Sequence, residues 1–350
     1  MKLFAAIDIG SCEVEMKIFQ ITSGKGIKEI DCVCHRMELG KDVYRDGRIG
    51  VEMTDELCRV LNDFVRIMKG YRVDDWRVCA TSAVREAGNQ LVFLDRVKRH
   101  TGLEVEVLSN ASQRFMDYKS IASRENEFNR IIQKGTAIVD VGGGSIQISL
   151  FDKDRLVASQ NMKIGNLRLR ERMMNEGVSL KHYETLLTEV VKNEFLSYKK
   201  LYLRDRVISN LIVVGDHIGD AVHKNVMTRA DFLNFYDDMI YRSDEDAAGR
   251  CEVPEDVISV LRPSLVVYRC FLEAADVENI WMPGLHLTDG MAYEYAQQNR
   301  LLKLGHDFDE DILAAARNAA KRYQCSKSHI KVCEDLAVGI FDKIKKSQGF

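Results

Sequence analysis

Two glycine-containing turns carry the residue types that bind phosphate. Gly10-Ser11 follows Asp8 at the end of a strand-like run, and a second glycine turn follows Asp140 in the same way. Glycine lets backbone N–H groups approach a phosphate, and an aspartate at a strand end can hold Mg²⁺ directly or through water. We therefore expect Asp8 and Asp140 to be metal ligands. The second turn is the stronger signal, because consecutive glycines are rarely tolerated in a strand pair without cause; its residues are Gly142, Gly143, Gly144 and Ser145. A flexible hairpin is the alternative for each turn.

A polar segment over residues 80–89 adds further phosphate-binding groups. It directly follows a predicted strand over residues 76–82. Thr81 and Ser82 can donate hydrogen bonds at the edge of a cleft, and Arg85 can grip phosphate oxygens through two N–H groups. The alternative is a helix cap followed by a solvated arginine.

The two turns belong to a repeated pattern. Asp140 lies 132 positions after Asp8, and Phe151 lies at the same offset from Phe19. Two copies in register predict a duplicated lobe, although two unrelated strand-turn-strand units would also give the pattern. Around each copy, strand-like runs alternate with amphipathic helices, which predicts mixed sheets with helices packed on them.

The predicted fold class is therefore α/β, with two lobes and a short all-α C-terminal segment. We expect a first lobe over residues 1–125, a second over 126–300, and a helical tail over 301–350. The last predicted helix, residues 326–346, has an apolar stripe that includes Ile330 and Ile344. Such a stripe should dock on the lobes, begin a further helical domain, or pair with a second copy in a homodimer.

Composition narrows the class of protein. The formal net charge is -3, which gives no support for non-specific nucleic-acid binding, although a phosphate-binding cleft is compatible with it. Nine cysteines show no zinc-site spacing, so reduced thiols in a cytoplasmic protein are expected. No apolar run approaches the roughly 18 residues of a membrane span, so we expect no membrane association.

Residues 80–89 resemble the signature of the exopolyphosphatase/guanosine pentaphosphate phosphatase family. Both glycine turns fall in that family's order, as do Ile164 to Leu169 and Thr288-Asp289-Gly290. The resemblance covers essentially the whole chain. It implies two ribonuclease H-like (actin-like) lobes and magnesium-assisted hydrolysis of a terminal phosphoanhydride, in polyphosphate or in the guanine nucleotide guanosine pentaphosphate. The tail resembles the start of the HD-type helical domain of longer members.

Several family positions differ in this chain. The adjacent glutamates that follow the strand near residue 108, one of them the family's general base, are Ser112 and Gln113. The glutamate after the triple-glycine turn is Gln147. An amide is far too weak a base to accept a proton from water, so weak or absent hydrolysis is expected. New ionisable groups on turns that should face the cleft could supply a relocated base: Glu13, Asp216 and His217.

Three functions are compatible with these residues. The first is a magnesium-dependent phosphoanhydride hydrolase, and the second is a non-catalytic module that binds polyphosphate or a nucleotide and signals through closure of its lobes. The missing glutamates favour the second as a mechanism. A sugar or acetate kinase relative shares the double phosphate turn, but the match over residues 80–89 argues against it.

Overall fold

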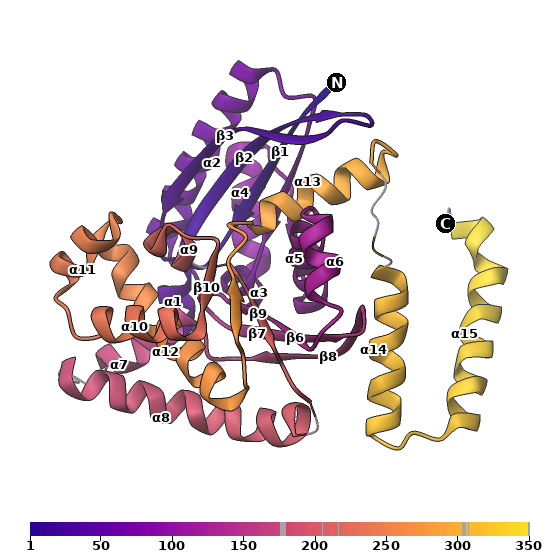
Figure 1. The fold of residues 1–350 in the computed structure, drawn as a ribbon. Helices are drawn as coiled ribbons and strands as arrows, with labels where there is room; N and C mark the ends of the chain where they lie inside the picture. Colours follow the sequence, from indigo (N-terminus) through magenta and orange to yellow (C-terminus); the bar gives the residue numbers. More distant parts are fainter. Residues whose placement is uncertain (176–179, 205, 216, 303–305, 307, 349–350) are drawn as a thin grey trace.

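The computed structural model describes residues 1–350 except 176–179, 205, 216, 303–305, 307 and 349–350. Two mixed sheets flanked by helices form two lobes, and a cavity lies where the lobes meet (Figure 1). This arrangement confirms the predicted α/β fold class with two lobes. Within the described residues, no helix is both long enough and apolar enough to cross a membrane.

The first lobe is built on a five-stranded sheet in the order β3-β2-β1-β4-β5. The apolar run at the start of the chain becomes β1, the buried central strand, because both of its faces are covered. On α2, Leu57, Leu61 and Phe64 lie on one helical face and pack into the core of this lobe. The strands are β1 (Lys2–Ile9), β2 (Glu13–Thr22), β3 (Gly26–Arg36), β4 (Asp75–Ala80) and β5 (Val105–Val107). The helices are α1 (Leu39–Asp46), α2 (Val51–Tyr71), α3 (Ser82–Glu86), α4 (Gln90–Thr101), α5 (Asn110–Ala122) and α6 (Glu125–Ile131).

The second lobe is built on a six-stranded sheet in the order β10-β11-β9-β6-β7-β8. Its central strand β6 is buried along its whole length, as the continuous apolar sequence requires. The strands are β6 (Thr136–Val141), β7 (Ile146–Asp152), β8 (Arg155–Met162), β9 (Asn210–Val214), β10 (Val226–Thr228) and β11 (Asn279–Trp281). The helices are α7 (Asn166–Asn175), α8 (Leu180–Tyr198) with the π-helical turn η1 (Lys199–Leu203), α9 (Ile218–Val222), α10 (Arg229–Met239), α11 (Asp244–Cys251) and α12 (Glu255–Ala274).

The two sheets repeat the same strand pairing. In the first lobe Asp8 of β1 lies opposite Glu15 of β2, and in the second Asp140 of β6 lies opposite Gln147 of β7. Each central strand also has a parallel neighbour, β4 in the first lobe and β9 in the second. The duplication predicted from the 132-residue offset is therefore present in the register of the strands.

Helix α13 (Leu287–Gln298) follows the second sheet in the chain but packs on the first sheet and on α5. Its Tyr295 ring stacks on Phe4 of β1 with 4.2 Å between the ring centroids. Asp289 accepts a 2.9 Å hydrogen bond from Lys17 of β2. The stretch 126–300 therefore contains a helix that contributes to the core of the first lobe.

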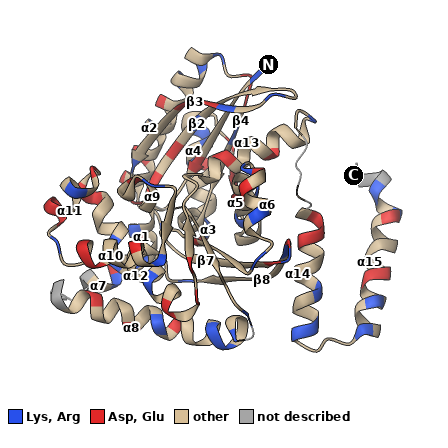
Figure 2. Cartoon of the chain, in the orientation of Figure 1, with Lys and Arg blue, Asp and Glu red and all other residues tan. Residues whose placement is uncertain are grey.

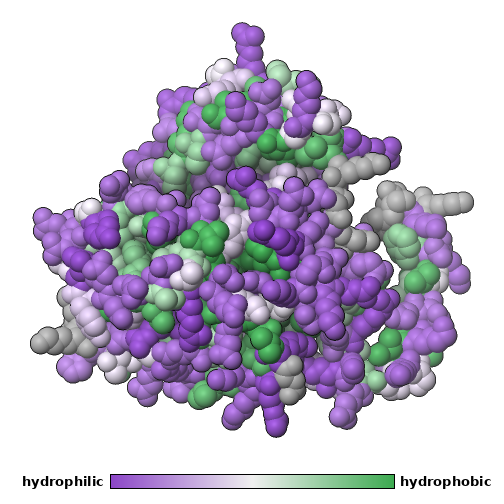
Figure 3. Space-filling model, viewed as in Figure 1, coloured by the Kyte–Doolittle hydropathy of each residue, from purple (hydrophilic) through white to green (hydrophobic). Residues whose placement is uncertain are grey.

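The two tail helices behave differently. In α14 (Phe308–Arg322), which packs against β8, Asp311 is 1 % exposed and accepts a hydrogen bond from the backbone N–H of Leu156 at 3.0 Å. In α15 (Lys327–Gln348), Leu336 and Ile340 are 60 % and 59 % exposed, and the helix stands apart from the lobes (Figures 1 and 3). The first tail helix thus docks on the second lobe and the second does not, so a further helical domain and pairing with a second copy stay the predictions for the stripe of α15.

Candidate functional site

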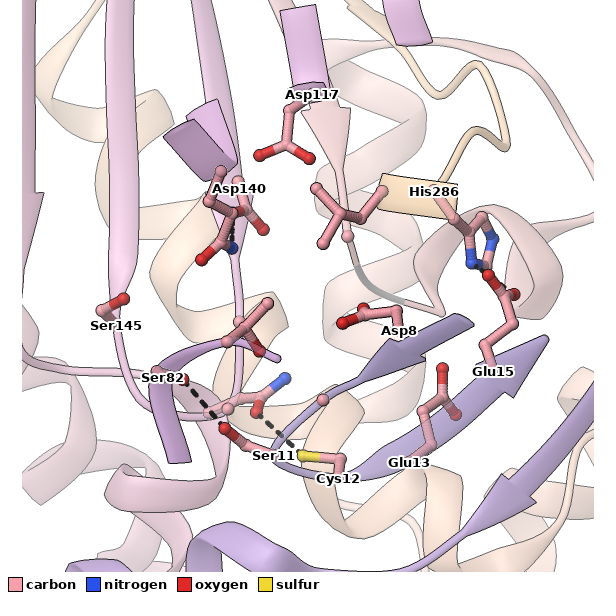
Figure 4. Close-up of a pocket in the computed structure, with 18 of the residues that line it drawn as sticks. Asp8, Ser11, Cys12, Glu13, Glu15, Ser82, Asp117, Asp140, Ser145 and His286 are labelled. Atoms are coloured by element: carbon pink, nitrogen blue, oxygen red, sulfur yellow. Dashed lines mark hydrogen bonds and ion pairs between the residues drawn. The ribbon is translucent and has the colours of Figure 1, made fainter. Parts of the chain in front are cut away.

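A cavity of about 110 Å³ lies between the lobes, and the two glycine turns form part of its wall. Asp8 and Asp140 both line it, as the repeat predicted. The other predicted site residues in its wall are Gly10, Ser11, Glu13, Thr81, Ser82, Gln113, Gly142, Gly143, Ser145 and His217. Residues that lie far apart in the sequence therefore meet at one site (Figure 4).

Other predicted residues do not line this cavity. The Arg85 guanidinium donates a 2.6 Å hydrogen bond to the carbonyl of Leu108, just before α5. Ser112 is exposed and hydrogen-bonded to Ser109, the N-cap of α5. Gln147 is 2 % exposed and lies next to Asp140 on the neighbouring strand β7. Asp216 lies outside the described residues.

The glycines of the second turn allow the two lobes to touch. A Cβ atom on Gly143 would lie 2.7 Å from the Ser11 Cβ, and one on Gly144 would overlap the Tyr44 hydroxyl. Ser11 in turn hydrogen-bonds to the hydroxyls of Ser82 and Tyr44, each at 2.8 Å. The close approach of the first lobe therefore requires glycine at these two positions, whether or not a ligand binds there.

Arginines of α7 link the two lobes. Arg170 donates two hydrogen bonds to Glu38, at 2.6 and 2.7 Å. Arg168 donates to Glu86 at 3.0 Å and to the carbonyl of Gly144 at 3.0 Å. A bidentate arginine–carboxylate pair is among the stronger polar contacts in proteins, so these arginines stabilise the contact between the lobes.

Two glutamine amides hold the Asp140 carboxylate. The Nε2 groups of Gln113 and Gln147 both donate to Asp140 Oδ2, each at 3.4 Å. A carboxylate at either position would be an acceptor and would repel Asp140. The two glutamine amides therefore surround Asp140 with neutral hydrogen-bond donors.

A further carboxylate, Asp117 of α5, lines the cavity and was missed by the sequence reasoning. Its burial, with Asp140 and Asp8 nearby, raises its pKa well above the usual range. Burial together with Glu15 and Glu13 raises the pKa of Asp8 in the same way. The available signal was the spacing: Asp117 lies four residues after Gln113 on one predicted helix.

Four buried oxygens at or beside the cavity accept no hydrogen bond from the described residues: Asp8 Oδ1, Gln113 Oε1, Asp117 Oδ2 and Gln147 Oε1. All are hard oxygen acceptors, the ligand type that Mg²⁺ prefers. No three His, Cys, Asp or Glu side chains in the described part of the chain are grouped closely enough to hold a metal directly. The donor set therefore fits a magnesium ion that keeps several waters, as this ion usually does.

Two of the candidate substitute bases, Glu13 and His217, form an ion pair with each other. Glu13 and His217 are 3.5 Å apart. Burial would raise the pKa of Glu13, but the hydrogen bond and charge of His217 lower it to about 2. Burial would lower the pKa of His217, but Asp220 and Glu13 raise it to about 10. A carboxylate so acidic and an imidazole so basic are both poor proton acceptors at neutral pH.

A second imidazole–carboxylate pair lines the cavity. His286 Nδ1 lies 2.9 Å from Glu15 Oε1, and Thr288 donates to the other oxygen of Glu15. Burial would lower the pKa of His286, but Glu15 raises it. The cavity thus carries two imidazoles, those of His217 and His286, whose pKa values are raised by neighbouring carboxylates.

The sequence profile of the Ppx/GppA phosphatase family matches residues 17–299. The chain is 20% identical over 352 residues to the guanosine-5'-triphosphate,3'-diphosphate pyrophosphatase of Photobacterium profundum, covering 97% of this chain and 67% of that protein. It is 27% identical over 180 residues to exopolyphosphatase 2 of Mycobacterium tuberculosis, covering 49% of this chain and 54% of that protein. It is also 27% identical over 180 residues to a bifunctional 3-dehydroquinate synthase/phosphatase of Fusobacterium nucleatum, covering 49% of this chain and 26% of that protein. The match thus spans about half or less of these last two relatives.

Solved structures show the same fold. A Cytophaga hutchinsonii exopolyphosphatase superposes with a TM-score of 0.74 at 17% identity, covering 87% of this chain and all of that one. The Aquifex aeolicus member of the family superposes with a TM-score of 0.68 at 22% identity, covering 85% and 98%. The two-lobed arrangement is therefore that of these proteins.

Proposed function

Because the chain belongs to the Ppx/GppA phosphatase family, we propose that it binds polyphosphate or guanosine pentaphosphate in the interlobe cavity and hydrolyses the terminal phosphoanhydride with magnesium. The observation that carries this proposal is the convergence of both glycine turns and both strand-end aspartates on one cavity. The buried acceptor oxygens beside them match the need for a cation.

The backbone of the turns supplies the phosphate contacts. Gly143 lines the cavity, and its N–H donates to no backbone carbonyl of the described residues, so it is available to a phosphate oxygen; Gly144 does not line the cavity. Asp8 and Asp140 are the candidate magnesium ligands. Magnesium at this site would neutralise charge on the transferred phosphoryl group, and the transition state otherwise needs mainly positioning.

Turnover is expected to be slow. Gln113 and Gln147 cannot accept a proton, and Ser112 points away from the cavity as part of the α5 cap. Loss of a positioned base typically costs about 10²–10⁴ in rate. Because the transition state of phosphoryl transfer is loose, part of the rate survives through positioning alone.

A non-catalytic binding module is the alternative, and the two amide hydrogen bonds to Asp140 favour it. In that case ligand binding would change how the lobes close, and closure would be read by a partner. The cytoplasmic location and a homodimer remain predictions.

Phosphate release from polyphosphate and from guanosine pentaphosphate, with magnesium or with EDTA, tests the proposal. The dissociation constant of each ligand is measured in parallel, with Asp140→Asn as the cleft variant. Magnesium-dependent release that Asp140→Asn abolishes supports hydrolysis, and tight binding without release supports the alternative. Absence of binding to either ligand would refute both.

The variant Arg85→Ala distinguishes the phosphate-binding role predicted from the sequence from the structural role suggested by the hydrogen bond to Leu108. The sequence predicts weaker polyphosphate binding, whereas the bond to Leu108 predicts a loss of stability of about 1 kcal/mol and nearly unchanged affinity. Ligand titration and urea unfolding of this variant distinguish the two.

A further inference from the structure

Asp117 occupies an unusual position for an acidic residue. It lies one helical turn after Gln113 on α5, and both side chains face the cavity. It is 5 % exposed, and its Oδ2 accepts no hydrogen bond from the described residues. Figure 4 shows its carboxylate pointing into the space between Asp140 and Asp8.

A buried carboxylate without a partner is costly, so its presence needs a reason. The neighbouring inward-facing residues of α5, Met116 and Ile121, are apolar, and an apolar side chain would suit the helix better. Carboxylates of this kind cluster at functional sites.

We propose that Asp117 is the proton acceptor of the hydrolysis, supplied from one helical turn beyond the position where Gln113 has lost that capacity. This inference rests on the proposed function. It explains how water can be activated at a site whose family base is an amide, and it replaces Glu13, Asp216 and His217 as the relocated base.

The step is a single displacement. The oxygen of a water molecule forms a bond to the terminal phosphorus, and the bond from that phosphorus to the bridging oxygen breaks. The bridging oxygen leaves with the electron pair on the shortened chain. A proton of the attacking water passes to Asp117, which later returns it to solvent, and orthophosphate is released.

The charged groups around Asp117 are compatible with this role. Asp140 of β6 and Asp8 of β1 raise its pKa in addition to burial, and Arg114 of its own helix lowers it. From α13, which packs on α5, the uncharged Leu287 lines the cavity, and His286 just before that helix is paired with Glu15. The placement of Asp117 is the stronger argument, because its unpartnered Oδ2 lies in the cavity wall where a water molecule beside Asp140 and Asp8 could transfer a proton to it.

Asp117→Asn is the test, because the change keeps the shape and removes the base. The expected result is a loss of kcat of about a hundredfold or more, with KM and the dissociation constant of Mn²⁺, measured by electron paramagnetic resonance, changed by less than about threefold. Returning the carboxylate with Gln113→Glu in the Asp117→Asn background should restore at least about tenfold.

Controls separate this role from a structural one. Asp311→Asn removes a carboxylate that is buried outside the cavity and should leave kcat unchanged. If Asp117→Asn does not fold, Asp117→Ser with added formate replaces it, and formate should raise its rate.

Two results would overturn the inference. Unchanged kcat in Asp117→Asn would do so while phosphate release by the wild type keeps the proposed function intact. A wild type that binds polyphosphate but releases no phosphate would end both the hydrolase proposal and this one.

Discussion

The substitution Gln147→Glu is expected to make stability depend on magnesium. Gln147 is 2 % exposed, and its amide donates to Asp140 Oδ2 at 3.4 Å. A glutamate in the same place removes a donor and sets a second carboxylate against the first. The unfolded chain feels neither effect, so the cost appears in the free energy of unfolding.

The size of the cost follows from two limits. Two unit charges 3.4 Å apart repel by about 5 kcal/mol at an effective dielectric constant of 20. The new glutamate can avoid this by staying protonated, which costs about 3.7 kcal/mol at pH 7 for an ordinary pKa near 4.3. The cheaper route sets the cost, so a loss of about 3.7 kcal/mol is expected in EDTA, together with a melting temperature lower by about 5 °C.

Magnesium should reverse most of this loss. A cation that binds only the folded protein stabilises it by about 2.7 kcal/mol at a hundred times its dissociation constant. Urea unfolding with EDTA and with magnesium measures the effect, and Gln147→Met is the matched control because it removes the amide without adding charge. Equal stability of the Glu and Met variants in EDTA, or no response of the Glu variant to magnesium, would contradict the account of Asp140 given above.

Three further predictions concern closure, pH and the tail. Gly144→Ala should keep the lobes apart, because the new methyl group would overlap the Tyr44 hydroxyl. Small-angle scattering should then show a larger radius of gyration than for the wild type. Gly249→Ala is the control, because its new methyl group would meet no atom within 4 Å. The folded pKa of His217, about 10, lies above its ordinary value of 6.5, so its stabilising contribution is complete below about pH 6.5 and is lost as the pH rises through 10. The stability difference between wild type and His217→Gln should therefore shrink by about 4 kcal/mol between pH 6 and pH 10, and a constant difference in urea unfolding would exclude this pairing. Asp311→Asn should loosen α14 from β8 and speed hydrogen exchange at the Leu156 amide by about tenfold, and unchanged exchange there would mean that this bond does not hold the helix.

The features that could be predicted from the sequence depend on local backbone chemistry. Two buried strands that end in Asp-x-Gly predicted both turns. The 132-residue offset between them predicted that the two lobes share one strand register. These features were predictable because each requires only neighbouring residues.

The features that were missed depend on what a segment packs against. The amphipathic pattern of α13 does not state which sheet it covers, and the pattern of α15 resembles a packing face although Leu336 is 60 % exposed. Arg85 was assigned to phosphate because its partner, the Leu108 carbonyl, lies 23 residues away. Asp117 was overlooked because an acidic residue within a helix is usually solvated, and only the fold places it inside.

The return of α13 to the first sheet bears on which fragments of this protein can be produced separately. A fragment that ends at residue 125 would expose Phe4 and Phe19, which in the whole chain are covered by Met291 and Tyr295. Lys17, buried beneath the same helix, would lose Asp289. Such a fragment would carry an apolar surface prone to self-association. The first lobe can therefore be recovered as an autonomous unit only if residues 287–298 are joined to it, for example through a short linker after α5 or α6.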